Sequence, residues 1–70
     1  MSDWRSRKGK QVLAALIKIG WKVKRQRGSH VVLERTNWSD YVWSFRDNEE
    51  LGRRMLVRIS KKTGLKPEDL

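Results

Sequence analysis

The sequence has no cysteine, one proline and one histidine, and these absences restrict the chemistry open to it. Without cysteine there are neither disulfide bonds nor thiolate metal ligands. One imidazole cannot build a closed zinc site, and no tight carboxylate group is present that could hold two metal ions. Asp47, Glu49 and Glu50 lie close together, but capping of a helix explains them better than magnesium binding. We therefore expect neither a metal nor another cofactor.

Long apolar runs are also missing. No stretch approaches the roughly 18 apolar residues of a membrane span, and no apolar segment follows the charged N-terminal residues as it would in a signal peptide. We therefore expect a cytoplasmic protein that has no membrane partner. A chain of 70 residues builds only a thin core, so we expect a single domain over residues 1–70 with a shallow surface site.

Acidic residues are scarce relative to basic ones. Eight Asp and Glu stand against seventeen Lys and Arg, which gives a formal net charge of +9. A positive field of this kind attracts polyanions and accelerates their encounter. The bases crowd residues 5–27 and return over residues 53–66. This excess indicates a nucleic-acid partner in preference to an anionic membrane or an acidic protein.

Two segments have the apolar spacing of helices. The first helix is expected over residues 8–19, with an apolar stripe and with Gly20 as its stop. The second is expected to begin near Asp47 and Glu50, which have the spacing of a capping box, and to end at Gly64.

Three segments between the helices alternate apolar and polar residues with the period of two that is typical of strands. They cover residues 21–26, 30–35 and 41–45, and short loops join them as in hairpins. The sequence therefore predicts an α+β fold in the order α-β-β-β-α, with a three-stranded antiparallel sheet and two helices on one face. The expected core is Val12, Leu13, Leu16, Ile17, Trp21, Val23, Val31, Leu33, Tyr41, Trp43, Phe45, Leu51, Met55, Leu56 and Ile59.

Strict alternation also predicts an open face of the sheet. If Trp21, Val31 and Trp43 point toward the helices, then Lys22, Lys24, His30 and Val32 point away from them. The same alternation places Arg25 on the inner face of the sheet, together with Trp21 and Val23. His30 is then solvent-accessible and flanked by cations. Trp4 and Trp38 lie in polar segments, where they can either pack over the edge of the core or stack on unpaired bases.

The turn over residues 25–30 combines groups that can bind a phosphate with one that can move a proton. Arg25 and Arg27 can grip phosphate oxygens, and the backbone at Gly28 and Ser29 can approach them closely. His30 supplies the side chain that exchanges protons near neutral pH. Metal-free RNA cleavage needs these functions, because the 2′-hydroxyl must lose a proton and the leaving 5′-oxygen must gain one.

The chain resembles the HicA toxin family, also called the YcfA family. The resemblance rests on Gly20-Trp21, a short basic strand, Arg25-Gln26 and Gly28-Ser29-His30, and it is supported by the segment over residues 59–70. It covers most of the chain, from about residue 8 to residue 70. It implies a fold similar to that of double-stranded-RNA-binding domains.

The resemblance implies a type II toxin that cleaves mRNA without a metal, with His30 as its essential histidine. It also implies a HicB-like antitoxin as the partner, and binding to operator DNA only through the complex with that antitoxin. The site expected from residues and resemblance together has His30 as the catalytic residue. The expected RNA-binding residues are Arg25, Arg27, Gly28, Ser29, Lys22, Lys24, Arg7, Lys8 and Lys10.

Two stretches depart from the family pattern. Members usually end the third strand with Val-Pro-x-His, whereas residues 44–47 read Ser-Phe-Arg-Asp. Many also carry Gly-Thr-Leu in the last helix, where residues 54–56 read Arg-Met-Leu. His30 is thus the only imidazole, and a second proton-transfer role falls to lysine, arginine or water.

Two other functions remain open from the sequence. The same fold can grip RNA by shape without cleaving it. Alternatively, the chain can bind DNA or act as a scaffold for a partner, with a basic second helix that carries Arg53, Arg54 and Arg58 in a groove.

Overall fold

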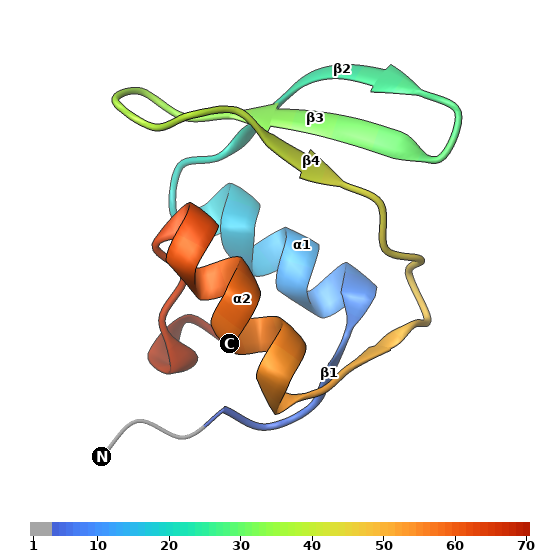
Figure 1. The fold of residues 1–70 in the computed structure, drawn as a ribbon, viewed down its shortest axis with the longest axis vertical. Helices are drawn as coiled ribbons and strands as arrows, with labels where there is room; N and C mark the ends of the chain where they lie inside the picture. Colours follow the sequence, from blue (N-terminus) through green and yellow to red (C-terminus); the bar gives the residue numbers. More distant parts are fainter. Residues whose placement is uncertain (1–3) are drawn as a thin grey trace.

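The computed structural model describes residues 4–70, so residues 1–3, which belong to the N-terminal segment considered above, lie outside the described residues. The elements are β1 (Arg7–Lys8), α1 (Gly9–Lys18), β2 (Lys22–Arg27), β3 (His30–Glu34), β4 (Tyr41–Trp43), β5 (Glu50–Leu51), α2 (Arg53–Thr63) and the 3-10 helix η1 (Pro67–Asp69). Figure 1 shows β2, β3 and β4 as one layer with α1 and α2 on the same side of it. The α+β architecture expected from the sequence, similar to that of double-stranded-RNA-binding domains, is confirmed.

Helix α1 lies within one residue of its predicted bounds at each end. Its first turn is held by the Gln11 side chain, whose Oε1 accepts a hydrogen bond of 2.9 Å from the Lys8 amide. The chain leaves the helix through Gly20, which has a φ of +115°. Gly9 is buried at the start of the helix, and a Cβ there would collide with the Arg46 carbonyl. This close approach fixes α1 against the segment that follows β4.

The sheet has the strand order β2-β3-β4, and both pairings are antiparallel. Val31 lies opposite Trp43, and Leu33 lies opposite Tyr41. The pairing of β2 with β3 shifts register between Val23 and Arg25, so one residue of β2 is additional to the ladder. The strict alternation predicted along β2 is therefore wrong beyond Val23, because a β-bulge moves the later residues to the opposite faces.

The predicted capping pair of the second helix is also wrong. Helix α2 begins only at Arg53, after Gly52, and Glu50 belongs to β5, which pairs with β1. The carbonyl oxygens of Asp47 and Glu49 instead accept the amides of Lys10 and Gly9, at 3.0 and 2.8 Å. The segment thus satisfies donors at the start of α1, which have no partner within that helix.

The core lies between the sheet and the two helices. Its buried apolar side chains are Val12, Ala15, Leu16, Trp21, Leu33, Trp43, Leu51, Leu56, Ile59 and Leu65. Val23 and Ile17, both expected in the core, are 55% and 45% exposed. Val23 lies on the edge strand β2, all of whose residues are exposed, and Ile17 lines a surface hollow together with Lys18 and Leu70.

Trp21 joins the sheet side of the core to the end of α2. Its ring is fully buried, and its Nε1 donates a hydrogen bond of 3.0 Å to the Thr63 carbonyl. Trp38 packs edge-on against it with ring centroids 6.0 Å apart, and the Arg35 guanidinium lies 5.3 Å from the Trp38 ring. Trp4 is partly buried against the core. Of the two alternatives given for Trp4 and Trp38, packing over the edge of the core therefore describes both side chains.

Gly64 ends α2 in the left-handed region, with a φ of +76°, and a Cβ there would lie 2.8 Å from the Trp38 ring. We expect Gly64→Ala to lower the free energy of unfolding by about 1–2 kcal/mol, because an L side chain is strained in this conformation. Urea unfolding followed by circular dichroism measures the change. Gly52→Ala is the matched control, since its Cβ meets no atom within 4 Å. Equal stabilities of the two variants would contradict the prediction.

Candidate nucleic-acid interface

The tip of the β2–β3 hairpin presents His30 beside a cation. Arg27 and His30 lie directly opposite each other in the ladder, and Gly28 and Ser29 form the two-residue turn between them. Side chains at directly opposite positions have Cβ atoms about 5 Å apart and share one face. Gly28 has a φ of +55°, as hairpin turns with glycine in the first position require, and no atom lies within 4 Å of its missing Cβ. The space above the turn is therefore open to a ligand.

The β-bulge brings a second arginine to the same face. Arg25 lies opposite Val32, and Gln26 lies opposite Val31 on the face toward the helices. Strict alternation placed Arg25 with the core residues, so this prediction is corrected by the register. Arg25 and Arg27 thus share the open face with His30, and all three are exposed. Within residues 4–70 none of the three side chains makes a hydrogen bond or an ion pair.

The opposite end of the open face carries balanced charge. The Lys24 ammonium lies 2.8 Å from Asp40 Oδ2, with both side chains partly exposed. Lys22 lies directly opposite Glu34 in the ladder. An exposed ion pair contributes little to stability, but it cancels part of the local positive field. The cations near the start of β2 therefore have acidic neighbours, which those at the hairpin tip lack within residues 4–70.

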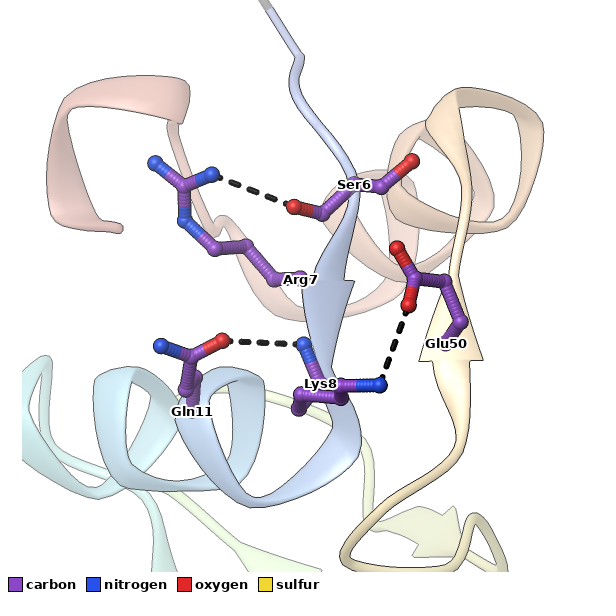
Figure 2. Close-up of polar contacts among 5 residues, drawn as sticks. All are labelled: Ser6, Arg7, Lys8, Gln11 and Glu50. Carbon is purple, nitrogen blue, oxygen red and sulfur yellow. Dashed lines mark hydrogen bonds and ion pairs between the residues drawn. The ribbon is translucent and has the colours of Figure 1, made fainter.

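The basic residues of β1, Arg7 and Lys8, form a separate group. Figure 1 shows β1 on the far side of the helices from the sheet. In Figure 2 the Lys8 ammonium reaches Glu50 Oε1 at 3.1 Å, and Arg7 Nη1 donates to the Ser6 carbonyl at 3.1 Å. Lys10 is exposed on the first turn of α1. Arg7 and Lys8 are thus not brought together with His30, and Lys8 is compensated by a carboxylate.

Two surface hollows were not expected from the sequence. The larger, about 660 Å³, lies over the start of α2, with Arg54 and Arg58 in its lining, and contains none of the predicted site residues. Another, about 510 Å³, is lined by Ser44, Arg46, Asn48 and Glu49. Arg46 follows β4 in a segment without strand or helix periodicity, so the available signals were its charge and its place in the stretch that departs from the family pattern.

Tyr41 is a titratable residue of β4 on the inner side of the sheet. Burial raises the pKa of the Tyr41 hydroxyl above its usual value of 10.0, because the phenolate would lose hydration. Tyr41 shares the inner face with Leu33, its partner in the ladder. It therefore stays protonated at neutral pH and lies away from the open face.

Neither a metal cluster nor a membrane-crossing helix occurs in the part of the chain that the structure describes. Over residues 4–70 no group of three or more His, Asp or Glu side chains is placed to hold a metal ion. The helices in the same range lack the length and apolar character that crossing a bilayer requires.

Comparison with known families gives one assignment. A family model described as the HicA toxin of bacterial toxin–antitoxin systems matches residues 9–65. The match runs from the first residue of α1 to just beyond α2, so it includes the hairpin and His30. No curated protein and no solved structure matches the chain.

Proposed function

The chain belongs to the HicA toxin family of bacterial toxin–antitoxin systems, and from this membership we propose that it is an endoribonuclease that cleaves mRNA without a metal ion. The observation that carries the proposal is the position of His30, which is exposed directly opposite Arg27 on an open, cationic end of the sheet. An imidazole beside an uncompensated guanidinium is suited to proton transfer at a phosphodiester.

The proposed reaction is attack of the RNA 2′-hydroxyl on the adjacent phosphorus. His30 takes the proton of the 2′-hydroxyl, and the bond from phosphorus to the 5′-oxygen breaks as that oxygen receives a proton. The products are a 2′,3′-cyclic phosphate and a 5′-hydroxyl. When His30 acts as the base, water or a neighbouring cationic side chain gives the proton to the 5′-oxygen. When His30 is protonated and acts as the acid, water accepts the proton of the 2′-hydroxyl.

The arginines hold the phosphate and stabilise the charge that develops on it. Arg25 and Arg27 share the face of His30, and neither is engaged by a carboxylate within residues 4–70. The open turn at Gly28 and Ser29 lets backbone amides approach the same phosphate. Stabilisation of developing negative charge by fixed donors contributes strongly to catalysis. Lys22, Lys24, Arg7, Lys8 and Lys10 contribute to the long-range attraction of RNA.

Membership of the family pairs this toxin with an antitoxin. We propose that the antitoxin is HicB-like, that it covers the hairpin tip, and that operator DNA is bound only by the complex. Because the substrate is mRNA, the proposed site of action is the cytoplasm.

We expect the purified chain to cut an mRNA transcript in the presence of EDTA and to leave 2′,3′-cyclic phosphate ends. A chelator leaves the rate unchanged, because the imidazole and the arginines supply proton transfer and charge stabilisation without a metal. End-group analysis of the fragments, with a 2′-deoxy oligonucleotide of the same sequence as the uncut control, makes the measurement. Intact RNA with strong, salt-dependent binding would replace this proposal with a binding module that does not cleave.

A further inference from the structure

We propose that residues 44–49 form a second phosphate subsite beside His30, with Arg46 as its cation. The inference rests on the proposed function, because it extends the same RNA-binding surface by one phosphate along the strand. The ligand is the sugar–phosphate backbone of single-stranded RNA. Arg46 belongs to the stretch that departs from the family pattern, but the sequence did not identify it as an RNA-binding residue.

The register of the sheet brings this segment to the catalytic end. The ladder between β3 and β4 ends with Val31 opposite Trp43. His30 directly precedes Val31 and Ser44 directly follows Trp43, so both residues lie just beyond this last pair, at the same end of the sheet. Arg46 follows two residues later and lines the hollow of about 510 Å³ together with Ser44. The hollow therefore lies at the end of the sheet at which β3 begins with His30.

The guanidinium of Arg46 is available for a phosphate. Arg46 is exposed, and its side chain makes no ion pair or hydrogen bond within residues 4–70. The nearby Glu49 carboxylate does not pair with the Arg46 guanidinium. Its Oε1 instead accepts a hydrogen bond of 3.1 Å from the Arg46 backbone amide. Asn48 also lines the hollow, and its amide can donate to a phosphate oxygen.

The segment is held in place before any ligand arrives. The Glu49 amide donates to the Arg46 carbonyl at 3.1 Å, which closes the turn. The carbonyls of Glu49 and Asp47 accept the amides of Gly9 and Lys10, so the turn is fixed to α1. A preorganised subsite loses little conformational entropy on binding.

The positions of these segments also indicate the path of the bound RNA over the surface. Figure 1 shows the hairpin tip, the segment after β4 and the start of α1 along the same side of the molecule. Arg27, Arg46 and Lys10 are the cations on these three elements, and all are exposed. The RNA backbone therefore runs from the hairpin tip across residues 44–49 toward α1, and Lys10 lies at the far end of this path.

The test measures binding in the absence of cleavage. In a His30→Ala background, fluorescence anisotropy of a labelled single-stranded RNA is followed as a function of salt concentration. Arg46→Gln is expected to weaken binding about tenfold and to reduce the salt slope by about one phosphate contact. Arg54→Gln, which removes an exposed arginine of α2, is the matched control and should change the affinity less than about twofold. Arg46→Lys should keep most of the salt slope, because it keeps the charge.

Equal affinities of Arg46→Gln and its parent would overturn the subsite, as would a loss of the same size in Arg54→Gln. Absence of measurable RNA binding by the His30→Ala chain would overturn it as well. Failure of the proposed cleavage activity gives a different result. In that case the parent chain leaves RNA intact, but Arg46→Gln still weakens RNA binding without a change in melting temperature, and the subsite stands. Cleavage by the parent combined with unaltered binding in Arg46→Gln overturns the subsite alone.

Discussion

Replacement of His30 by alanine is expected to lower the rate of RNA cleavage by at least about 100-fold. His30 is the only imidazole in the chain, so no other side chain of this type can take over its proton transfer. The side chain is exposed and unpartnered within residues 4–70, and the stability should therefore change by less than about 0.5 kcal/mol. Gel analysis of transcript cleavage and growth curves after induction make the two measurements.

Binding and folding of the same variant separate catalysis from recognition. His30→Ala should still bind RNA, because Arg25 and Arg27 are unchanged. The control is Ser60→Ala, a substitution on α2, which lies on the other side of the core from the open face. It should cleave RNA like the parent chain. Equal cleavage and equal growth arrest by parent and His30→Ala would eliminate the proposed mechanism.

Replacement of Trp21 by alanine should have the largest effect on stability. Removal of a fully buried tryptophan costs about 3–5 kcal/mol, through lost burial and the cavity that remains. The variant also loses the hydrogen bond to the Thr63 carbonyl near the end of α2. At about 0.05–0.15 kcal/mol per residue, a chain of 70 residues is stable by only roughly 4–10 kcal/mol, so we expect Trp21→Ala to be largely unfolded at 37 °C.

Thermal unfolding followed by far-UV circular dichroism tests this expectation. Trp38→Ala is the control, because that side chain is 41% exposed and its removal leaves a smaller cavity. Its melting temperature should lie between those of Trp21→Ala and the parent. A melting temperature of Trp21→Ala within a few degrees of the parent value would show that α2 does not depend on this contact.

The elements with a strong period were predictable from the sequence, and the irregular ones were not. Helix α1 and the three strands of the sheet lie where the apolar spacing indicated, because burial of one face imposes that spacing. Strands β1 and β5 have two residues each, too few to show any alternation. Asp47 and Glu50 have the spacing of a capping pair, but they do not cap α2. The backbone carbonyls of this segment instead accept hydrogen bonds from the first amides of α1.

The candidate site was predictable in its residues but not in its arrangement. The Gly-Ser-His turn after a basic strand could be identified from the sequence alone. The bulge between Val23 and Arg25 could not, because nothing in the local sequence distinguishes it from regular alternation. Only the register shows that Arg25 shares a face with His30. The role that we propose for Arg46 depends on a turn whose hydrogen bonds reach α1, and such long-range contacts leave no local pattern.

The outer edge of β2 has a further consequence for the behaviour of the free protein. A strand at the margin of a sheet has unpaired backbone groups that can recruit the same strand of a second molecule, and this is a common route to aggregation. Four of the six residues of β2 are cations, and the bulge interrupts the flat edge. Two such edges repel each other and fit poorly. The arginines that we propose to bind RNA thereby also oppose edge-to-edge association of the chain while its antitoxin is absent.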